Sequence, residues 1–391
     1  MPRPRGAPLS AHGVDAVGQS SFLLVANGSA ETPPASAVLR FLVDSGSEVT
    51  TIFHPLNAED AGVHAVARWA GGRQVLERRL RLPSKPPYTY PLDALAPLLR
   101  PKVDGWIGFS NLSAADGVLR RRLGLVRRVA YWAVDFVPDR FGAGSALTHA
   151  YDAVDRFASK RVDLRVELTA LARDERSARL RLGVDAAPTH IAPIGIWLDR
   201  MPRAPEDAWR LRKVVFAGHL VPRQGVATLV EAIALVPDVA LEITGRGPEE
   251  PALRALVAER GIADRVLFHG FLDDHRDVER VVASASVAVA PYATDPDSFT
   301  RFADPSKLRM YAAAGLPMVI TDVPPNAREL ERVAGATVVD YEPRAVAAAI
   351  AAILASPDDW RRRRQAALAY AEGYDWARIV PAALERLGFA V

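Results

Sequence analysis

Residues 286–322 constrain the fold more than any other part of this chain. Two apolar runs, Val287–Ala290 and Met318–Thr321, have the length and composition of buried strands. A polar loop and a short helix lie between them, and Pro305 and Gly315 mark where that helix begins and ends. The pattern predicts a loop at the carboxyl end of a strand, which is the edge where open α/β sheets bind ligands.

The first turn of that helix has the features of a phosphate site. Asp304 or Ser306 can cap the helix, and Lys307 follows directly. Unpaired N–H groups and the helix dipole favour an anion at this position. Arginine is the usual cation of the chain, so a lysine at this point also argues for a function. We expect Lys307 to contact a phosphate group.

The composition is that of a globular chain with room for two domains. The chain has 391 residues, of which 49% are hydrophobic, enough to fill two separate cores. It has no cysteine, which excludes disulfides, thiolate metal sites and a cysteine nucleophile, and its eight histidines show no paired spacing. We therefore expect no metal. The net charge of +3 argues against a nucleic-acid partner.

The sequence also bears on location. No apolar run has the length of a membrane span or a signal peptide, so we expect a cytoplasmic protein. The arginines between Arg120 and Arg128 are either a solvated helix face or a patch that contacts anionic lipid. The second interpretation would make the protein membrane-associated and would suit a lipid-linked acceptor.

Strand and helix patterns alternate along both halves of the chain and predict parallel sheets with right-handed crossovers. Residues 1–19 lack periodicity, and we expect a flexible leader there. An amino-terminal Rossmann-like domain is expected over residues 20–200, a linker over 201–212, and a second Rossmann-like domain over 213–370.

Three polar residues of the first domain are expected at the carboxyl ends of strands: Asn27, His54 and Asp135. Asn27 begins either a turn that lines the ligand crevice or an ordinary βα turn. His54 is either an acceptor contact or a satisfied loop histidine. Asp135 stands in an aromatic-rich stretch and is either a desolvated general base or the cap of the following turn.

The second half of the chain resembles the nucleotide-sugar-binding domain of the GT-B glycosyltransferases, in which two Rossmann-like domains face each other across a cleft. The resemblance rests on short motifs: the Gly218 turn, Gly245-x-Gly247, Gly270-Phe271, Pro291-Tyr292, Asp304 to Leu308, and Ala313 to Pro317. It implies an α/β fold of the GT-B type, an acceptor-binding first domain and a carboxyl-terminal helix, within residues 371–391, that returns to it.

The resemblance also implies the chemistry. The donor would be a nucleotide diphosphate sugar, with UDP-sugars favoured, and no metal or other cofactor would be needed, because basic side chains and helix amino termini carry the phosphate charge. The donor-binding residues carried over are Gly218, His219, Gly245, Phe271, Tyr292, Ser306 and Lys307.

The chain departs from the large retaining GT-B family, which usually has an arginine and a lysine after the first strand of this domain and a glutamate pair near Gly-Leu-Pro. The four positions here hold His219, Gln224, Phe302 and Met310. The local pattern is more similar to the inverting xanthan-pathway glucuronosyltransferase family. In that family an aspartate that matches Asp135, four residues after a tyrosine, serves as the base.

We therefore expect a glycosyltransferase that moves a sugar from a nucleotide diphosphate sugar to an acceptor hydroxyl, with inversion and with Asp135 as the base. The acceptor would be a glycan, a lipid-linked sugar or a small molecule, and His54 and Asn27 would lie on its side of the cleft. Two other functions stay open: a catalytically silent binding or auxiliary protein, and a nucleotide-sugar epimerase.

Overall fold

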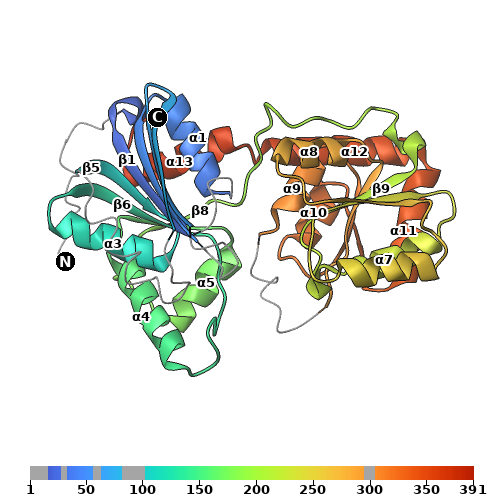
Figure 1. Cartoon of the computed structure of the whole chain (residues 1–391), viewed down its shortest axis with the longest axis horizontal. Coiled ribbons are helices and arrows are strands. Elements are labelled where there is room, and N and C mark those ends of the chain that lie inside the picture. The colour runs from blue at the N-terminus through green and yellow to red at the C-terminus, as the bar shows by residue number, and fades with distance from the viewer. Residues whose placement is uncertain (1–15, 28–32, 56–62, 82–101, 295–303) are drawn as a thin grey trace, which may run out of the picture.

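The structure, a computed structural model, describes residues 16–27, 33–55, 63–81, 102–294 and 304–391. These residues form two α/β domains, each built around one sheet with helices on both faces (Figure 1). Phe302 and the turn expected to begin at Asn27 lie, beyond Asn27 itself, outside the described residues.

The first sheet has eight strands in the order β4-β3-β2-β1-β5-β6-β7-β8. All neighbours from β2 to β8 are parallel, and β1 pairs with both β2 and β5. The strands are β1 (Ser21–Asn27), β2 (Glu48–His54), β3 (Val63–Ala70), β4 (Arg73–Arg81), β5 (Val103–Gly108), β6 (Val126–Ala133), β7 (Leu164–Glu167) and β8 (Thr189–Ile191). The helical segments are η1 (Val17–Gln19), α1 (Ala35–Asp44), α3 (Asn111–Arg122), α4 (Ala146–Arg161) and α5 (Ala170–Arg179).

The antiparallel hairpin β3–β4 at the edge of this sheet is an addition to the predicted alternation of strands and helices. Its turn is Gly71-Gly72, and both glycines have positive φ, as two-residue hairpin turns require. A pair of glycines between alternating runs is the local signal for such a hairpin, and it is present here at Gly71-Gly72.

The second sheet has six parallel strands in the order β11-β10-β9-β12-β13-β14, an order typical of dinucleotide-binding domains. The strands are β9 (Lys213–Ala217), β10 (Ala240–Thr244), β11 (Val266–Gly270), β12 (Val287–Ala290), β13 (Met318–Thr321) and β14 (Thr337–Val339). The helical segments are η3 (Ala208–Leu211), η4 (Pro222–Gln224), α6 (Val226–Ala234), α7 (Glu250–Glu259), α8 (His275–Ala283), α9 (Ser306–Ala313), α10 (Ala327–Val333), α11 (Pro343–Ala355) and α12 (Pro357–Glu372).

The last helix, α13 (Trp376–Leu387), packs on the first domain although it follows the second in sequence (Figure 1). It contacts α1, β6 and β7, and Trp376 is buried in the core on that face of the first sheet. The two-domain α/β architecture expected from the sequence is therefore confirmed.

Two expectations about connecting segments need correction. Residues 16–19 are not a loose leader, because Val17 is buried and its N–H donates to the Ala390 carbonyl at 2.7 Å. The expected linker 201–212 is not free either. Met201, Ala204 and Ala208 are buried in the core of the second domain, which their apolar side chains enter as the chain arrives.

We expect Trp376→Ala to lower the free energy of unfolding of the first domain by about 3–5 kcal/mol, because it leaves a cavity where the indole was. Hydrogen exchange should show lower protection in β6 and unchanged protection in β12. Arg378→Ala, at an exposed position of the same helix, is the control and should change the free energy of unfolding by less than about 0.5 kcal/mol. Loss of protection confined to β12 would contradict the placement of α13.

Candidate functional site

The first part of the candidate site lies at the carboxyl ends of the strands of the second sheet. Gly218 follows β9, Gly245 follows β10, and Phe271 follows β11. Tyr292 comes two residues after β12, the strand on the other side of β9. Strand order reverses between β9 and β12, and ligands of open α/β sheets bind in the crevice outside that point. Four predicted donor residues thus lie along one sheet edge.

Two of these residues are glycines with positive φ, and their backbones approach each other closely at this sheet edge. A Cβ atom on Gly245 would lie 1.9 Å from the carbonyl oxygen of Gly218, which excludes any side chain there. A Cβ atom on Gly218 would lie 2.6 Å from Nζ of Lys307. The structure therefore brings Gly218, Gly245 and Lys307 together.

Helix α9 carries Lys307 to this edge. Tyr311, one helical turn further on, is fully buried and its hydroxyl accepts a hydrogen bond from the N–H of Ala217 at 2.8 Å. Residues four apart lie on one helix face, so the anchor at Tyr311 also aims Lys307 at the end of β9. The Nζ atom of Lys307 lies 4.1 Å from the centre of the Phe216 ring.

Lys307 is partly buried, and its ammonium group donates a hydrogen bond to a neutral acceptor, Oε1 of Gln224 at 2.6 Å. Burial, and to a lesser extent the positive charge of Arg223, lower the pKa of Lys307 from 10.5 to about 7. The charge of Arg223 thus acts on an ammonium group that lies against glycine backbone, an arrangement suited to an anion. Sequence reasoning missed Arg223 and gave Gln224 no role, although the departure at Gln224 was visible.

The other predicted donor residues have different surroundings. Tyr292 is buried, and the centre of its ring lies 5.3 Å from Nζ of Lys307, so the ring packs beside the amine. Phe271 is exposed and has the guanidinium of Arg246 at 4.6 Å from its ring centre. His219 and Ser306 are exposed.

The expectation that Asp304 or Ser306 caps α9 is wrong. The helix begins at Ser306 with Pro305 as its N-cap residue, and no side chain caps it. Asp304 is buried, where it accepts a hydrogen bond from the N–H of Ile194 at 2.6 Å and pairs with Arg309. Burial raises the pKa of Asp304, and the charge of Arg309 opposes that shift. Its tertiary partners replace the local cap that the sequence suggested.

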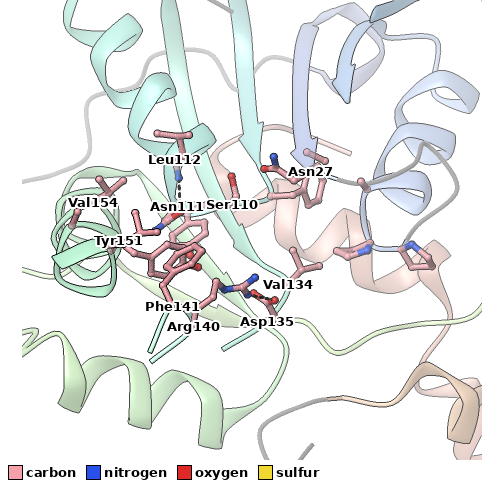
Figure 2. A pocket seen from close by; sticks show the side chains of 18 residues that line it. Asn27, Ser110, Asn111, Leu112, Val134, Asp135, Arg140, Phe141, Tyr151 and Val154 are labelled. Carbon is pink, nitrogen blue, oxygen red and sulfur yellow. Dashed lines mark hydrogen bonds and ion pairs between the residues drawn. The ribbon is translucent and has the colours of Figure 1, made fainter. Parts of the chain in front are cut away.

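The second part of the candidate site is a pocket of about 440 Å³ in the first domain, shown in Figure 2. It lies where strand order reverses in the first sheet, between the carboxyl ends of β1 and β5, and one face of α4 closes it. The polar residues in its wall are Asn27, Ser110, Asn111, Tyr131, Asp135, Arg140 and Tyr151.

Asp135 lies two residues beyond β6 and faces this pocket (Figure 2). Its carboxylate is about half exposed and pairs with Arg140. The aromatic residues around it therefore do not bury the carboxylate, contrary to the expectation of a desolvated base. The ion pair with Arg140 instead holds the carboxylate at the pocket wall.

A buried charge network supports the backbone at Asp135. The guanidinium of Arg176 donates to the Asp135 carbonyl at 2.6 Å and to the Tyr131 hydroxyl at 3.2 Å. Arg176 also pairs with Asp155 and with Glu167, and all its partners except Asp135 are buried. Buried ion pairs and hydrogen bonds of this kind hold their members in one arrangement. Sequence reasoning missed Arg176, because its partners come from α4, β6 and β7.

The two residues expected on the acceptor side are separated by the structure. Asn27 ends β1 and lines the pocket. His54 ends β2 but is not among the lining residues. It is buried, its Nδ1 lies 2.9 Å from Nδ1 of His64, and burial together with the charge of His64 lowers the pKa of His54 to about 4.

Three arginines of the patch between Arg120 and Arg128 are buried or form ion pairs within the protein, unlike the side chains of a solvated helix face. Arg120 is fully buried beside the Trp106 ring, and Arg121 and Arg128 both pair with Asp163. None of the described helices is long and apolar enough to cross a membrane. Within the described ranges, no group of three or more histidine, aspartate or glutamate side chains could hold a metal ion.

The chain is similar in sequence to known glycosyltransferases. Residues 212–356 match the family described as "Glycosyl transferases group 1". The D-inositol 3-phosphate glycosyltransferase of Xylanimonas cellulosilytica is 31% identical over 241 residues, which are 56% of this chain and 55% of that protein. The chain spans about half the length of the curated relatives it matches.

Solved structures show the same fold over nearly the whole chain. Sucrose-phosphate synthase from Thermosynechococcus elongatus has a TM-score of 0.68 at 18% identity and covers 94% of this chain and 98% of its own. Anabaena HepE in complex with UDP has a TM-score of 0.64 at 16% identity and covers 94% and 99%. Residues 212–356 therefore belong to the group 1 glycosyltransferase family, and the chain as a whole has the GT-B fold.

Proposed function

We propose that the protein is a glycosyltransferase that moves a sugar from a nucleotide diphosphate sugar to an acceptor hydroxyl. The observation that carries the proposal is that the amine of Lys307, which feels the charge of Arg223, lies against the backbone of Gly218, and Gly245 closely approaches that same backbone. A backbone without side chains lets a diphosphate approach closely, and the two cations attract it. The complex of HepE with UDP makes a uridine nucleotide the first donor to test.

In the proposed transfer Asp135 takes the proton of the acceptor hydroxyl, and the hydroxyl oxygen forms a bond to the anomeric carbon of the donor. The bond between that carbon and the diphosphate oxygen breaks, and its electron pair leaves with the nucleotide diphosphate. Attack from the face opposite to the leaving group inverts the anomeric centre. Lys307 and the first N–H groups of α9 stabilise the charge that develops on the leaving diphosphate.

The proposal includes no metal, because Lys307, Arg223 and the amino terminus of α9 supply positive charge at the diphosphate. The pocket in the first domain is the proposed acceptor site, since Asp135 lies in its wall. The acceptor would be a glycan, a lipid-linked sugar or a small molecule.

A screen of the purified chain against UDP-, GDP- and dTDP-sugars tests the proposal. Ligand that binds only the folded state raises the melting temperature by mass action, so one nucleotide should do so. Mass spectrometry should also detect slow hydrolysis of that donor. Binding without hydrolysis or transfer to any acceptor would favour a silent binding protein, and isomerised donor without acceptor would favour an epimerase. If no nucleotide shifts the melting temperature, the donor site is wrong.

The role of Lys307 predicts a pH dependence of UDP affinity. A bound diphosphate raises the pKa of Lys307 above its value of about 7 in the free protein, so binding takes up a proton above that pH. Affinity should therefore fall between about pH 7 and about pH 8.5, by up to about tenfold per pH unit. Isothermal titration calorimetry measures the effect.

Lys307→Arg is the matched control, because the guanidinium stays charged throughout this range and the affinity should not change with pH. Lys307→Met should bind UDP weakly at every pH. A wild-type profile as flat as that of Lys307→Arg would show that the amine of Lys307 does not contact the diphosphate.

The role of Asp135 predicts a defect in turnover without a defect in donor binding. We expect Asp135→Asn to lower kcat by about 10²–10⁴, the usual contribution of a general base, while UDP affinity stays unchanged. Asp139→Asn is the control: Asp139 pairs with Arg179 outside the pocket and has a positive φ that asparagine tolerates. Near-normal turnover of Asp135→Asn would exclude Asp135 as the base.

A further inference from the structure

We infer that the pocket in the first domain binds an alcohol with an apolar body in preference to an unsubstituted sugar. The inference rests on the proposed function and names the class of acceptor. Three observations carry it: the composition of the wall, the bonds that three of its polar side chains already form within the protein, and the apolar face of one helix that lines the pocket.

Eleven of the 18 described residues that line the pocket are apolar (Figure 2). Their side chains come from the ends of β1 and β5, the start of α1, helix α3, the segment after β6, and α4. They are Ala26, Pro33, Pro34, Ala35, Phe109, Leu112, Val134, Phe141, Leu147, Ala150 and Val154. A volume of about 440 Å³ is within the range of sites that bind drug-sized compounds.

Several polar side chains of the wall are already bonded within the protein. Asn111 donates to the Tyr151 carbonyl at 3.1 Å and accepts from the Leu112 N–H at 2.8 Å. The hydroxyl of Ser110 forms the capping box of α3, and the hydroxyl of Tyr131 accepts from Arg176. These bonds use part of the hydrogen-bonding capacity of the three side chains.

This use of polar atoms decides between two ligands that aromatic walls accept. A sugar ring can stack on an aromatic side chain, but each of its buried hydroxyl groups needs a hydrogen-bond partner. Beyond these three, the polar groups in the wall are Asn27, the Asp135–Arg140 pair and the hydroxyl of Tyr151 (Figure 2). One hydroxyl beside Asp135 can be hydrogen-bonded there, whereas the further hydroxyls of a sugar would lie against a wall that is mostly apolar.

Helix α4 supplies the complementary apolar surface. Leu147, Ala150, Tyr151 and Val154 follow the spacing of one helix face, and all four line the pocket. Leu147 is 42% exposed, so this face is open to an incoming molecule. An apolar body on α4 places its hydroxyl toward Asp135, where the proposed transfer takes the proton.

The test compares three alcohols by calorimetry on the full chain saturated with UDP: 2-naphthol, geraniol and methyl β-D-glucopyranoside. We expect 2-naphthol or geraniol to bind at least about tenfold more tightly than the glucoside, from burial of the apolar body. The first two distinguish an aromatic from an aliphatic body. Equal or tighter binding of the glucoside would overturn the inference, as would failure of both apolar alcohols.

Two variants of α4 locate the binding. Ala150→Phe fills the pocket at an exposed position and should abolish binding of the apolar alcohol, whereas Ala153→Phe, exposed on the same helix and outside the wall, should leave it intact. Unchanged binding by Ala150→Phe would overturn the inference. UDP affinity is measured in the wild type and in both variants, and it separates the two proposals. A wild type that does not bind UDP contradicts the proposed donor site. A wild type that binds UDP but neither apolar alcohol contradicts only the inference about this pocket.

Discussion

The close approach of two glycine backbones is the constraint on which the donor crevice depends. The N–H of Gly218 donates to the Thr244 carbonyl at the end of β10, and the N–H of Gly245 donates to the Gly270 carbonyl at the end of β11. Three strand ends are thereby joined in one layer of backbone. Any side chain at Gly245 would collide with the carbonyl of Gly218 and separate β9 from β10. The position of Lys307 follows from this layer, because its amine lies against Gly218.

The free protein holds an unfavourable arrangement at this layer. The ammonium group of Lys307 is partly removed from water, lies near the cation Arg223, and has the neutral Gln224 as its hydrogen-bond acceptor. A carboxylate in place of Gln224 would stabilise the lysine but would also repel a diphosphate. The hydrogen bond of Lys307 to a neutral amide in place of a carboxylate thus suits an anion site, where binding groups commonly sacrifice stability for function.

Local sequence signals predicted the parts of the molecule that depend on local structure. Glycines after apolar runs indicated the ends of β9 and β10, and a lysine in the first turn of a helix indicated the site of Lys307. Features set by distant partners could not be predicted in this way. Asp304 has the position of a helix cap but bonds Ile194, which is 110 residues away, and Arg176 joins side chains from three elements. The acceptor pocket likewise depends on how α4 lies against the sheet.

The return of α13 to the first domain means that the chain passes between the domains twice. The two passages are bonded to each other: the N–H of Ile196 donates to the Tyr374 carbonyl at 2.8 Å, and the N–H of Trp376 donates to the Ile196 carbonyl at 3.0 Å. Any rotation of one domain against the other must bend both passages at this one place. In the part of the chain that the structure describes, the two domains are therefore joined by a paired, double-stranded connection, and a rotation of one domain would have to bend both strands together.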